Sequence, residues 1–162
     1  MKNGTFVFDA HTGVWDGSAQ NCKNRFGDAF IETFYAFHTG FNPPDPHWRM
    51  DYETQFRKTD PEWYLDEMFV KGEADMAILS TQVLMDFYHQ GFVTADRNQR
   101  MVARAPERLI GLGGVDPRAP NAVQEVERQV TECGMKGFKW YTAEWRGESR
   151  GWSANDPMVF PL

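Results

Sequence analysis

Four short apolar segments alternate with segments of helical pattern, and this alternation most constrains the fold. The apolar segments cover residues 5–8, 75–81, 109–116 and 136–141. From the second segment onward they begin about 30 residues apart, the length of one strand–helix–strand unit. Such units place parallel strands side by side through right-handed crossovers. The sequence therefore predicts an α/β fold with four parallel strands in the order one, two, three, four.

Helix start and stop signals bound the segments between these strands. Asp60 is a candidate N-cap, and Pro61 suits the first helical position that follows it. In the third helix, Val123, Val126 and Val130 recur at helical spacing and predict a buried stripe. The predicted helices cover residues 61–71, 96–105 and 121–133.

Residues 14–60 form a long excursion between the first strand and the first clear helix. The excursion is rich in aromatic residues, and a short helix is predicted over residues 29–38, before a proline-rich break at 42–46. In a parallel barrel, an insertion after a strand lies over the catalytic face. The excursion is thus a candidate lid and apolar pocket wall, with Trp15 a candidate substrate-binding residue. Equally, its aromatic residues could cover the barrel mouth or a subunit interface.

Asp9 and His11 follow the first apolar run and are two residues apart, which places them on one side of a strand. The C-terminal ends of parallel barrel strands carry the chemistry, and carboxylate and imidazole are usual zinc ligands. Asp9 and His11 are therefore candidate metal ligands. The alternative is an aspartate that caps the next turn and a histidine bonded to backbone, which spacing alone favours.

The sequence around Asp9 and His11 resembles the opening of the amidohydrolase-related family, metal-dependent (β/α)8 enzymes that include aminocarboxymuconate-semialdehyde decarboxylase-like proteins. Members open with Asp-x-His-x-His or Glu-x-His, and here Gly13 stands where a second histidine often stands. The resemblance continues through Gly137-Phe138-Lys139 and residues 141–147. It implies one divalent metal, with zinc favoured, that Asp9 and His11 would hold together with ligands from later strands. The aspartate would then replace the histidine that is missing at Gly13.

The resemblance covers only the first half of the family's length. Four strands are half of a (β/α)8 barrel, and a helix signal at residues 155–157 is followed by the chain end at Leu162. We expect residues 1–162 to form the N-terminal half of a barrel, with the 14–60 insertion over the catalytic face. Unpaired strand edges and an uncovered core predict a complementary half-barrel chain or self-association. The chain alone is expected to be inactive.

The loop after the fourth predicted strand carries Glu144 and Arg146, which are candidate substrate-binding residues. The planar guanidinium of Arg146 would suit a substrate carboxylate. The alternative is a solvated or interface salt-bridge cluster. Lys139 is interpreted as structural, and no catalytic residue is assigned.

A net charge of −6 argues against nucleic-acid binding, which needs clustered basic residues. The sequence lacks a membrane-length apolar run and the apolar core of a signal peptide, so we expect a cytoplasmic protein with a small-molecule substrate. Two functions remain open. The chain is either the N-terminal half of a metal-dependent hydrolase or decarboxylase for a small carboxylated or cyclic substrate, or a non-catalytic half-barrel subunit.

Overall fold

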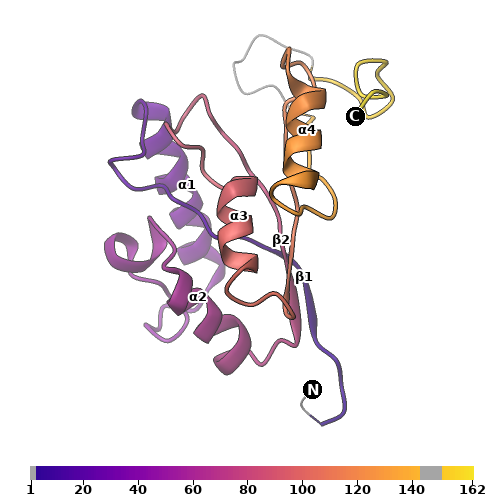
Figure 1. Ribbon diagram of the computed structural model, residues 1–162. Coiled ribbons are helices and arrows are strands. Elements are labelled where there is room, and N and C mark those ends of the chain that lie inside the picture. Colours follow the sequence, from indigo (N-terminus) through magenta and orange to yellow (C-terminus); the bar gives the residue numbers. More distant parts are fainter. Residues whose placement is uncertain (1–2, 143–150) are drawn as a thin grey trace.

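A three-stranded parallel sheet organises the protein (Figure 1), in a computed structural model that describes residues 3–142 and 151–162. The strands are β1 (Phe8–Thr12), β2 (Met76–Leu79) and β3 (Leu109–Gly111), in the order β1-β2-β3. The parallel pairing and the strand order confirm the prediction. β1 begins later than expected, so Asp9 and His11 lie within the strand, and its register is irregular between Asp9 and Thr12.

The predicted fourth strand is shorter than expected, which corrects the number of strands in the described residues to three. Its segment forms a single parallel bridge between Gly113 and Phe138. Gly113 N–H donates to the Gly137 carbonyl at 2.9 Å, and Lys139 N–H donates to the Gly113 carbonyl at 3.0 Å. The ladder stops at the next residue because the side chain of Gln129 bonds both the N–H and the carbonyl of Gly114.

Side-chain caps begin four of the described helical elements, and the cap of α2 lies where the sequence predicts it. Asp60 accepts a hydrogen bond from the Trp63 N–H, and Pro61 is the first helical residue. The predicted helix 61–71 is observed as an α-helix that continues as a π-helix, while the helix predicted at 29–38 is longer at both ends. No helix of the described residues is long and apolar enough to cross a membrane. The helical elements are α1 (Arg25–Phe41), η1 (Tyr52–Phe56), α2 (Pro61–Asp66), η2 (Glu67–Lys71), α3 (Ala95–Val102) and α4 (Ala122–Thr131).

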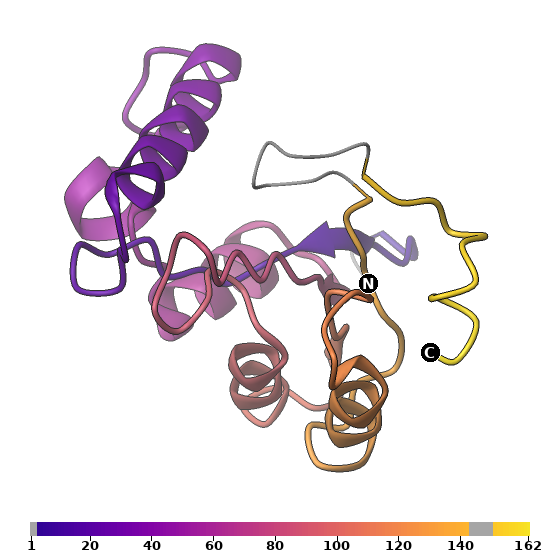
Figure 2. The same cartoon turned by 90° about the horizontal axis from the view of Figure 1, so that it is seen from above.

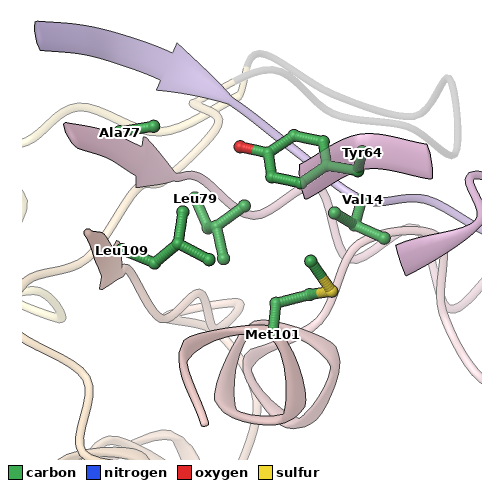
Figure 3. Packing of buried hydrophobic residues seen from close by; sticks show 6 residues of the cluster. All are labelled: Val14, Tyr64, Ala77, Leu79, Met101 and Leu109. Carbon is green, nitrogen blue, oxygen red and sulfur yellow. The ribbon is translucent and has the colours of Figure 1, made fainter. Parts of the chain in front are cut away.

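The main core lies between the sheet and helices α2 and α3 (Figure 3). Leu79 of β2 and Leu109 of β3 pack there with Tyr64 of α2 and Met101 of α3. These residues come from consecutive strand–helix units, as the right-handed crossover predicts. The strand–helix alternation thus produces a continuous apolar layer on one face of the sheet.

The apolar run that opens the chain and two of the valines of α4 are partly exposed. Phe6 and Phe8 are each about half exposed, because β1 is an edge strand of the described sheet. On α4, Val123 and Val130 face solvent, while Gln129 is buried. The prediction of a buried valine stripe is therefore wrong: α4 turns toward the sheet the side that carries the Gln129 amide.

The excursion of residues 14–60 contains a second apolar core, here called the excursion cluster. Ile31 and Phe56 pack there against Leu84, Tyr88 and Phe92 of the loop that follows β2. The Tyr88 hydroxyl donates to the carbonyl of Gly27 at 2.7 Å. Within the described excursion the assigned elements are helices, as predicted, and its strand-like contacts are isolated bridges.

A buried carboxylate, Asp16, joins the excursion to α3. Its Oδ2 lies 3.2 Å from both Lys58 Nζ and Arg97 Nη2, and the Ser18 hydroxyl donates to its Oδ1 at 2.5 Å. Burial raises the pKa of Asp16, but the hydrogen bonds from Ser18 and the positive charge of Arg97 outweigh this effect and lower it. The charged form of Asp16 is thus part of the folded structure.

Asn98 of α3 ties together the C-terminal ends of two strands. Its side-chain amide is fully buried and donates to the carbonyls of Leu79 at 3.0 Å and Leu112 at 2.9 Å. These carbonyls stand where β2 and β3 diverge into their loops. At Leu79 the amide adds to a backbone hydrogen bond from the Leu112 N–H at 2.9 Å, and at Leu112 it gives the carbonyl a side-chain donor.

Asn98→Ala should lower the free energy of unfolding by about 1–3 kcal/mol, because the Leu112 carbonyl loses its side-chain donor and the Leu79 carbonyl keeps only the Leu112 N–H. Urea denaturation followed by circular dichroism measures this change. Gln99→Ala is the matched control, since Gln99 is the next residue of α3 but is exposed, and its side chain bonds the Glu132 carbonyl at the protein surface. Equal losses in the two variants would contradict a special role for Asn98.

Asp16→Asn should destabilise the protein by roughly 2–3 kcal/mol at pH 7, because it leaves Arg97 without its buried partner. The pKa of Asp16 in the folded protein lies below its ordinary value of 3.8, so the stabilisation is present above that pH. It is lost as pH falls from about 4 through the folded pKa.

The difference in urea midpoint between wild type and Asp16→Asn should therefore shrink between pH 7 and pH 3. Asp86→Asn, at an exposed position, should show little difference at either pH. If the difference in urea midpoint between the wild type and Asp16→Asn is the same at both pH values, the charge of Asp16 does not contribute to stability.

Candidate functional site

The C-terminal part of β1 presents the first two candidate ligands together. The His11 N–H donates to Asp9 Oδ1 at 2.9 Å, across the irregular part of the strand. Asp9 is opposite Ala77 of the main core, and its negative charge adds to burial in raising the pKa of Tyr64 to about 12. One carboxylate oxygen of Asp9 thus holds the backbone of His11 within the strand.

Lys139 reaches His11 from the segment beside β3. Its Nζ lies 2.8 Å from His11 Nε2, and it also lies 4.8 Å from the centre of the Tyr141 ring. An ammonium group can only donate, so His11 Nε2 accepts this hydrogen bond and the imidazole proton is on Nδ1. The lysine that was interpreted as structural therefore contacts a candidate ligand directly.

The backbone around Gly113 and Gly114 is what brings Lys139 into place. A Cβ atom on Gly114 would lie 2.4 Å from Thr81 Oγ1 and 3.2 Å from the Lys139 carbonyl. The Thr81 hydroxyl donates to the Gly113 carbonyl at 2.8 Å, so the loops after β2 and β3 touch here. Glycine at 114 permits this close approach.

A cavity of about 810 Å³ opens beside Lys139, between the loops that follow β2 and β3. We call it the loop cavity. Its walls include the basic residues Arg97, Arg100, Arg118 and Lys139. This volume suits a small organic ligand.

Most acidic side chains of the loop cavity are already in ion pairs. Asp96 and Glu125 both bond Arg128, and Asp116 bonds Arg118 at 2.9 Å. Hydrogen bonds from Arg128 lower the pKa of both Asp96 and Glu125, which keeps these carboxylates charged and paired. Arg100 and Lys139 are not members of these ion pairs, and they give this wall of the cavity a positive character that suits an anionic ligand.

The described residues do not form a complete metal site. Among residues 3–142 and 151–162, no group of three or more His, Cys, Asp or Glu side chains could hold a metal ion. Asp9 and His11 are two potential ligands, fewer than the three protein ligands of a catalytic zinc site. A Cβ atom on Gly13 would lie 3.8 Å from the Ser80 carbonyl, an ordinary contact, so close packing does not explain why glycine stands there.

The candidate substrate-binding residues have different outcomes. Trp15 lies in the excursion cluster, where its ring contacts Phe34, Phe56 and Phe92 and its indole N–H donates to the Phe56 carbonyl. In the structure, Trp15 therefore packs with other aromatic rings in an apolar core. Glu144 and Arg146 lie outside the described residues.

Sequence interpretation missed the polar residues that hold the site in place. Asn98 and Gln129 are buried, and each follows a buried alanine of its helix, Ala95 or Ala122, at helical spacing. An amide on the apolar side of a helix was the signal that could have found them. The contact between Lys139 and His11 had no local signal, since the two are 128 residues apart.

Solved structures with little sequence identity share this fold. An uncharacterised TIM-barrel protein from Bordetella bronchiseptica matches with a TM-score of 0.58 and 10% identity, over 97% of this chain and 50% of its own. 5-Carboxyvanillate decarboxylase from Novosphingobium aromaticivorans, solved with bound manganese, matches with a TM-score of 0.57 and 15% identity, over 99% and 47%. 4-Oxalomesaconate hydratase from Rhodopseudomonas palustris gives 0.51 and 14%, over 96% and 47%.

This chain therefore spans about half the length of the solved structures that it matches. Its parallel sheet and covering helices correspond to half of a TIM barrel, as the sequence predicted. The sequence model of the amidohydrolase family matches residues 8–159, which is nearly the whole chain. This protein belongs to the amidohydrolase family.

Proposed function

We propose that this chain is the N-terminal half of a metal-dependent amidohydrolase-family enzyme that hydrolyses or decarboxylates a small carboxylated or cyclic substrate. A C-terminal half would complete the barrel, as a complementary chain or as a further part of the same protein. The contact between Lys139 and His11, at the edge of the loop cavity, is the observation that carries this proposal. It joins a candidate ligand to a cavity at the end of the sheet where barrel enzymes place their chemistry.

The basic wall of the loop cavity supports a carboxylated substrate. Arg100 and Lys139 lie on this wall, and an ammonium or guanidinium group binds a carboxylate through charge-assisted hydrogen bonds. The fold similarity to a decarboxylase of 5-carboxyvanillate favours decarboxylation over hydrolysis. Glu144 and Arg146 stay predicted contributors to substrate binding.

Asp9 and His11 would provide part of the metal site, and the other ligands would come from the C-terminal half. A bound divalent ion would supply a Lewis acid that polarises a substrate oxygen or activates water. Zinc is the ion that the sequence favours, whereas the similar decarboxylase was solved with manganese. In this chain, Asp9 holds the backbone of His11, and Lys139 occupies His11 Nε2, so His11 would bind the ion through this nitrogen only once Lys139 has moved away from it.

The alternative function is a non-catalytic half-barrel subunit that stabilises a partner. Gly13, in place of a second histidine, motivates it. Metal content of the completed protein separates the two functions, because a structural subunit has no need for His11. The cytoplasmic location expected from the sequence is part of either proposal.

His11→Ala should reduce the metal content of the completed barrel from about one ion to below about 0.1, because it removes a ligand. Decarboxylation of 5-carboxyvanillate and hydration of 4-oxalomesaconate are the first activities to assay. Inductively coupled plasma mass spectrometry of the protein, purified together with its completing half, measures the metal. The 162-residue chain alone should bind little.

His47→Ala is the matched control, since His47 is an exposed loop residue whose ring contacts Trp48. Asp9→Asn distinguishes a ligand from a residue that positions His11: loss of the ion indicates a ligand, and affinity weaker by about 10–100-fold indicates positioning. If His11→Ala retains its metal and activity, the catalytic proposal is wrong and the structural one replaces it.

A further inference from the structure

The side chain of Lys139 occupies the nitrogen of His11 that a metal ion would need. Its ammonium donates a hydrogen bond to His11 Nε2 over 2.8 Å, and the ring proton is on Nδ1. Nε2 therefore carries the lone pair through which this imidazole could bind a metal ion. A lone pair accepts a proton or binds a metal ion, but it does not do both. In the structure, His11 is thus masked as a ligand.

The contact between Lys139 and His11 spans the sheet instead of joining neighbouring strands. His11 belongs to β1, whereas Lys139 follows the bridge residue Phe138 beside β3, so β2 and β3 lie between them. Three strand spacings of about 4.8 Å amount to roughly 14 Å in a flat sheet, and only a long side chain can cross them. The segment that carries Lys139 follows α4 and passes close to β1 in Figure 2. The ammonium therefore lies near the C-terminal ends of the strands, where barrel enzymes place their chemistry.

The partners of the Lys139 ammonium within the described residues are uncharged. They are the imidazole of His11 and the ring of Tyr141, whose centre lies 4.8 Å from Nζ. In residues 3–142 and 151–162, Lys139 belongs to none of the ion pairs. A carboxylate in the loop cavity, which both Lys139 and Tyr141 line, would be a stronger partner, because both groups then carry charge.

Lys139 can exchange one partner for the other without moving its backbone. Its N–H is held by the Gly113 carbonyl at 3.0 Å, while its four-carbon stem is flexible. Rotation of the stem toward a carboxylate in the loop cavity would break the hydrogen bond to His11 and free Nε2. An empty cavity offers only water in exchange. The hydrogen bond to His11 therefore persists until an anion enters.

A purely structural role explains the contact less well. The hydrogen bond between Lys139 and His11 is exposed, so it adds little to stability. The loops beside it are held by other groups, the Thr81 hydroxyl and the Gln129 amide, which bond the backbone after β3. Lys139 is thus not needed to hold its own segment in place.

We propose that Lys139 couples the loop cavity to His11: the ammonium stays on Nε2 while the cavity is empty, and a carboxylate in the cavity draws it away. This inference rests on the proposed function, in which His11 is a metal ligand and the cavity takes a carboxylated substrate. Because coupling between two binding sites is reciprocal, carboxylate binding and metal binding favour each other. The further ligands of a completed barrel would also displace Lys139, so the 162-residue chain shows the coupling most directly.

Nuclear magnetic resonance of the 162-residue chain with nitrogen-15-labelled histidine tests the contact without any metal. At about pH 8.5, where imidazole groups are neutral, the His11 ring should carry its proton on Nδ1. Lys139→Met removes the ammonium at nearly constant length, so the ring should then populate both tautomers. Excess benzoate should shift the wild-type His11 signals toward those of Lys139→Met, whereas the neutral benzamide should leave them unchanged.

Paramagnetic Mn²⁺ tests the coupling to metal binding. The Mn²⁺ concentration that half-broadens the His11 signals should be about threefold to tenfold lower in Lys139→Met, because one hydrogen bond no longer competes. Benzoate should lower it by up to the same factor in the wild type and should not change it in Lys139→Met. The matched control is Lys136→Met, which removes the same charge from an exposed position of the same segment and should respond as the wild type does. Circular dichroism checks the fold of each variant.

Several outcomes would overturn the coupling. They are equal Mn²⁺ responses of the wild type and Lys139→Met, a benzoate effect that persists in Lys139→Met, and benzoate and benzamide that act alike on the wild type. Loss of stability in Lys139→Met with an unchanged His11 spectrum would show a structural role instead. All of these results concern the 162-residue chain, so they leave the proposed function to be decided by the metal content of the completed barrel. If His11→Ala keeps its metal there, the proposed function fails even where Lys139 masks Nε2.

Discussion

Two side-chain amides supply hydrogen bonds to the backbone at the C-terminal ends of β2 and β3, where the strands diverge into their loops. Asn98 bonds the ends of both strands, and Gln129 bonds the N–H and the carbonyl of Gly114. A buried carbonyl without a donor is unfavourable, so these bonds determine where the loops can begin. The loop cavity and the position of Lys139 both depend on these hydrogen bonds, because the loops after β2 and β3 begin at the strand ends that the two amides hold.

Local signals in the sequence were enough to predict the order of the elements. Asp60 and Pro61 begin α2, and the parallel order of the strands follows from the spacing of the strand–helix units. The errors occur where a tertiary contact outweighs a local pattern. The valine spacing on α4 suggested its buried side, but Gln129 is the buried residue because its amide bonds both the N–H and the carbonyl of Gly114. One polar group thus decided the orientation of the helix.

The candidate site was predictable only in part, for the same reason. Asp9 and His11 are near neighbours, so a short motif was sufficient to select them. Lys139 becomes their neighbour only because its segment lies parallel to β3, which is a property of the whole sheet. The family resemblance correctly indicated an amidohydrolase barrel and its N-terminal half. The charge of the loop cavity could not be predicted, because it depends on which residues the fold brings together.

The excursion cluster has a consequence for how the chain acquires its structure. Ile31 and Phe56 precede their partners Leu84, Tyr88 and Phe92 in the sequence, with α2 and β2 between them. On the ribosome, the aromatic side chains of the excursion emerge before the residues that bury them. Contacts so distant in sequence also form slowly, since a long loop must close first. The nascent chain therefore exposes these aromatic side chains until residues 84–93 have been synthesised, and apolar surface that is exposed in this way is prone to aggregate.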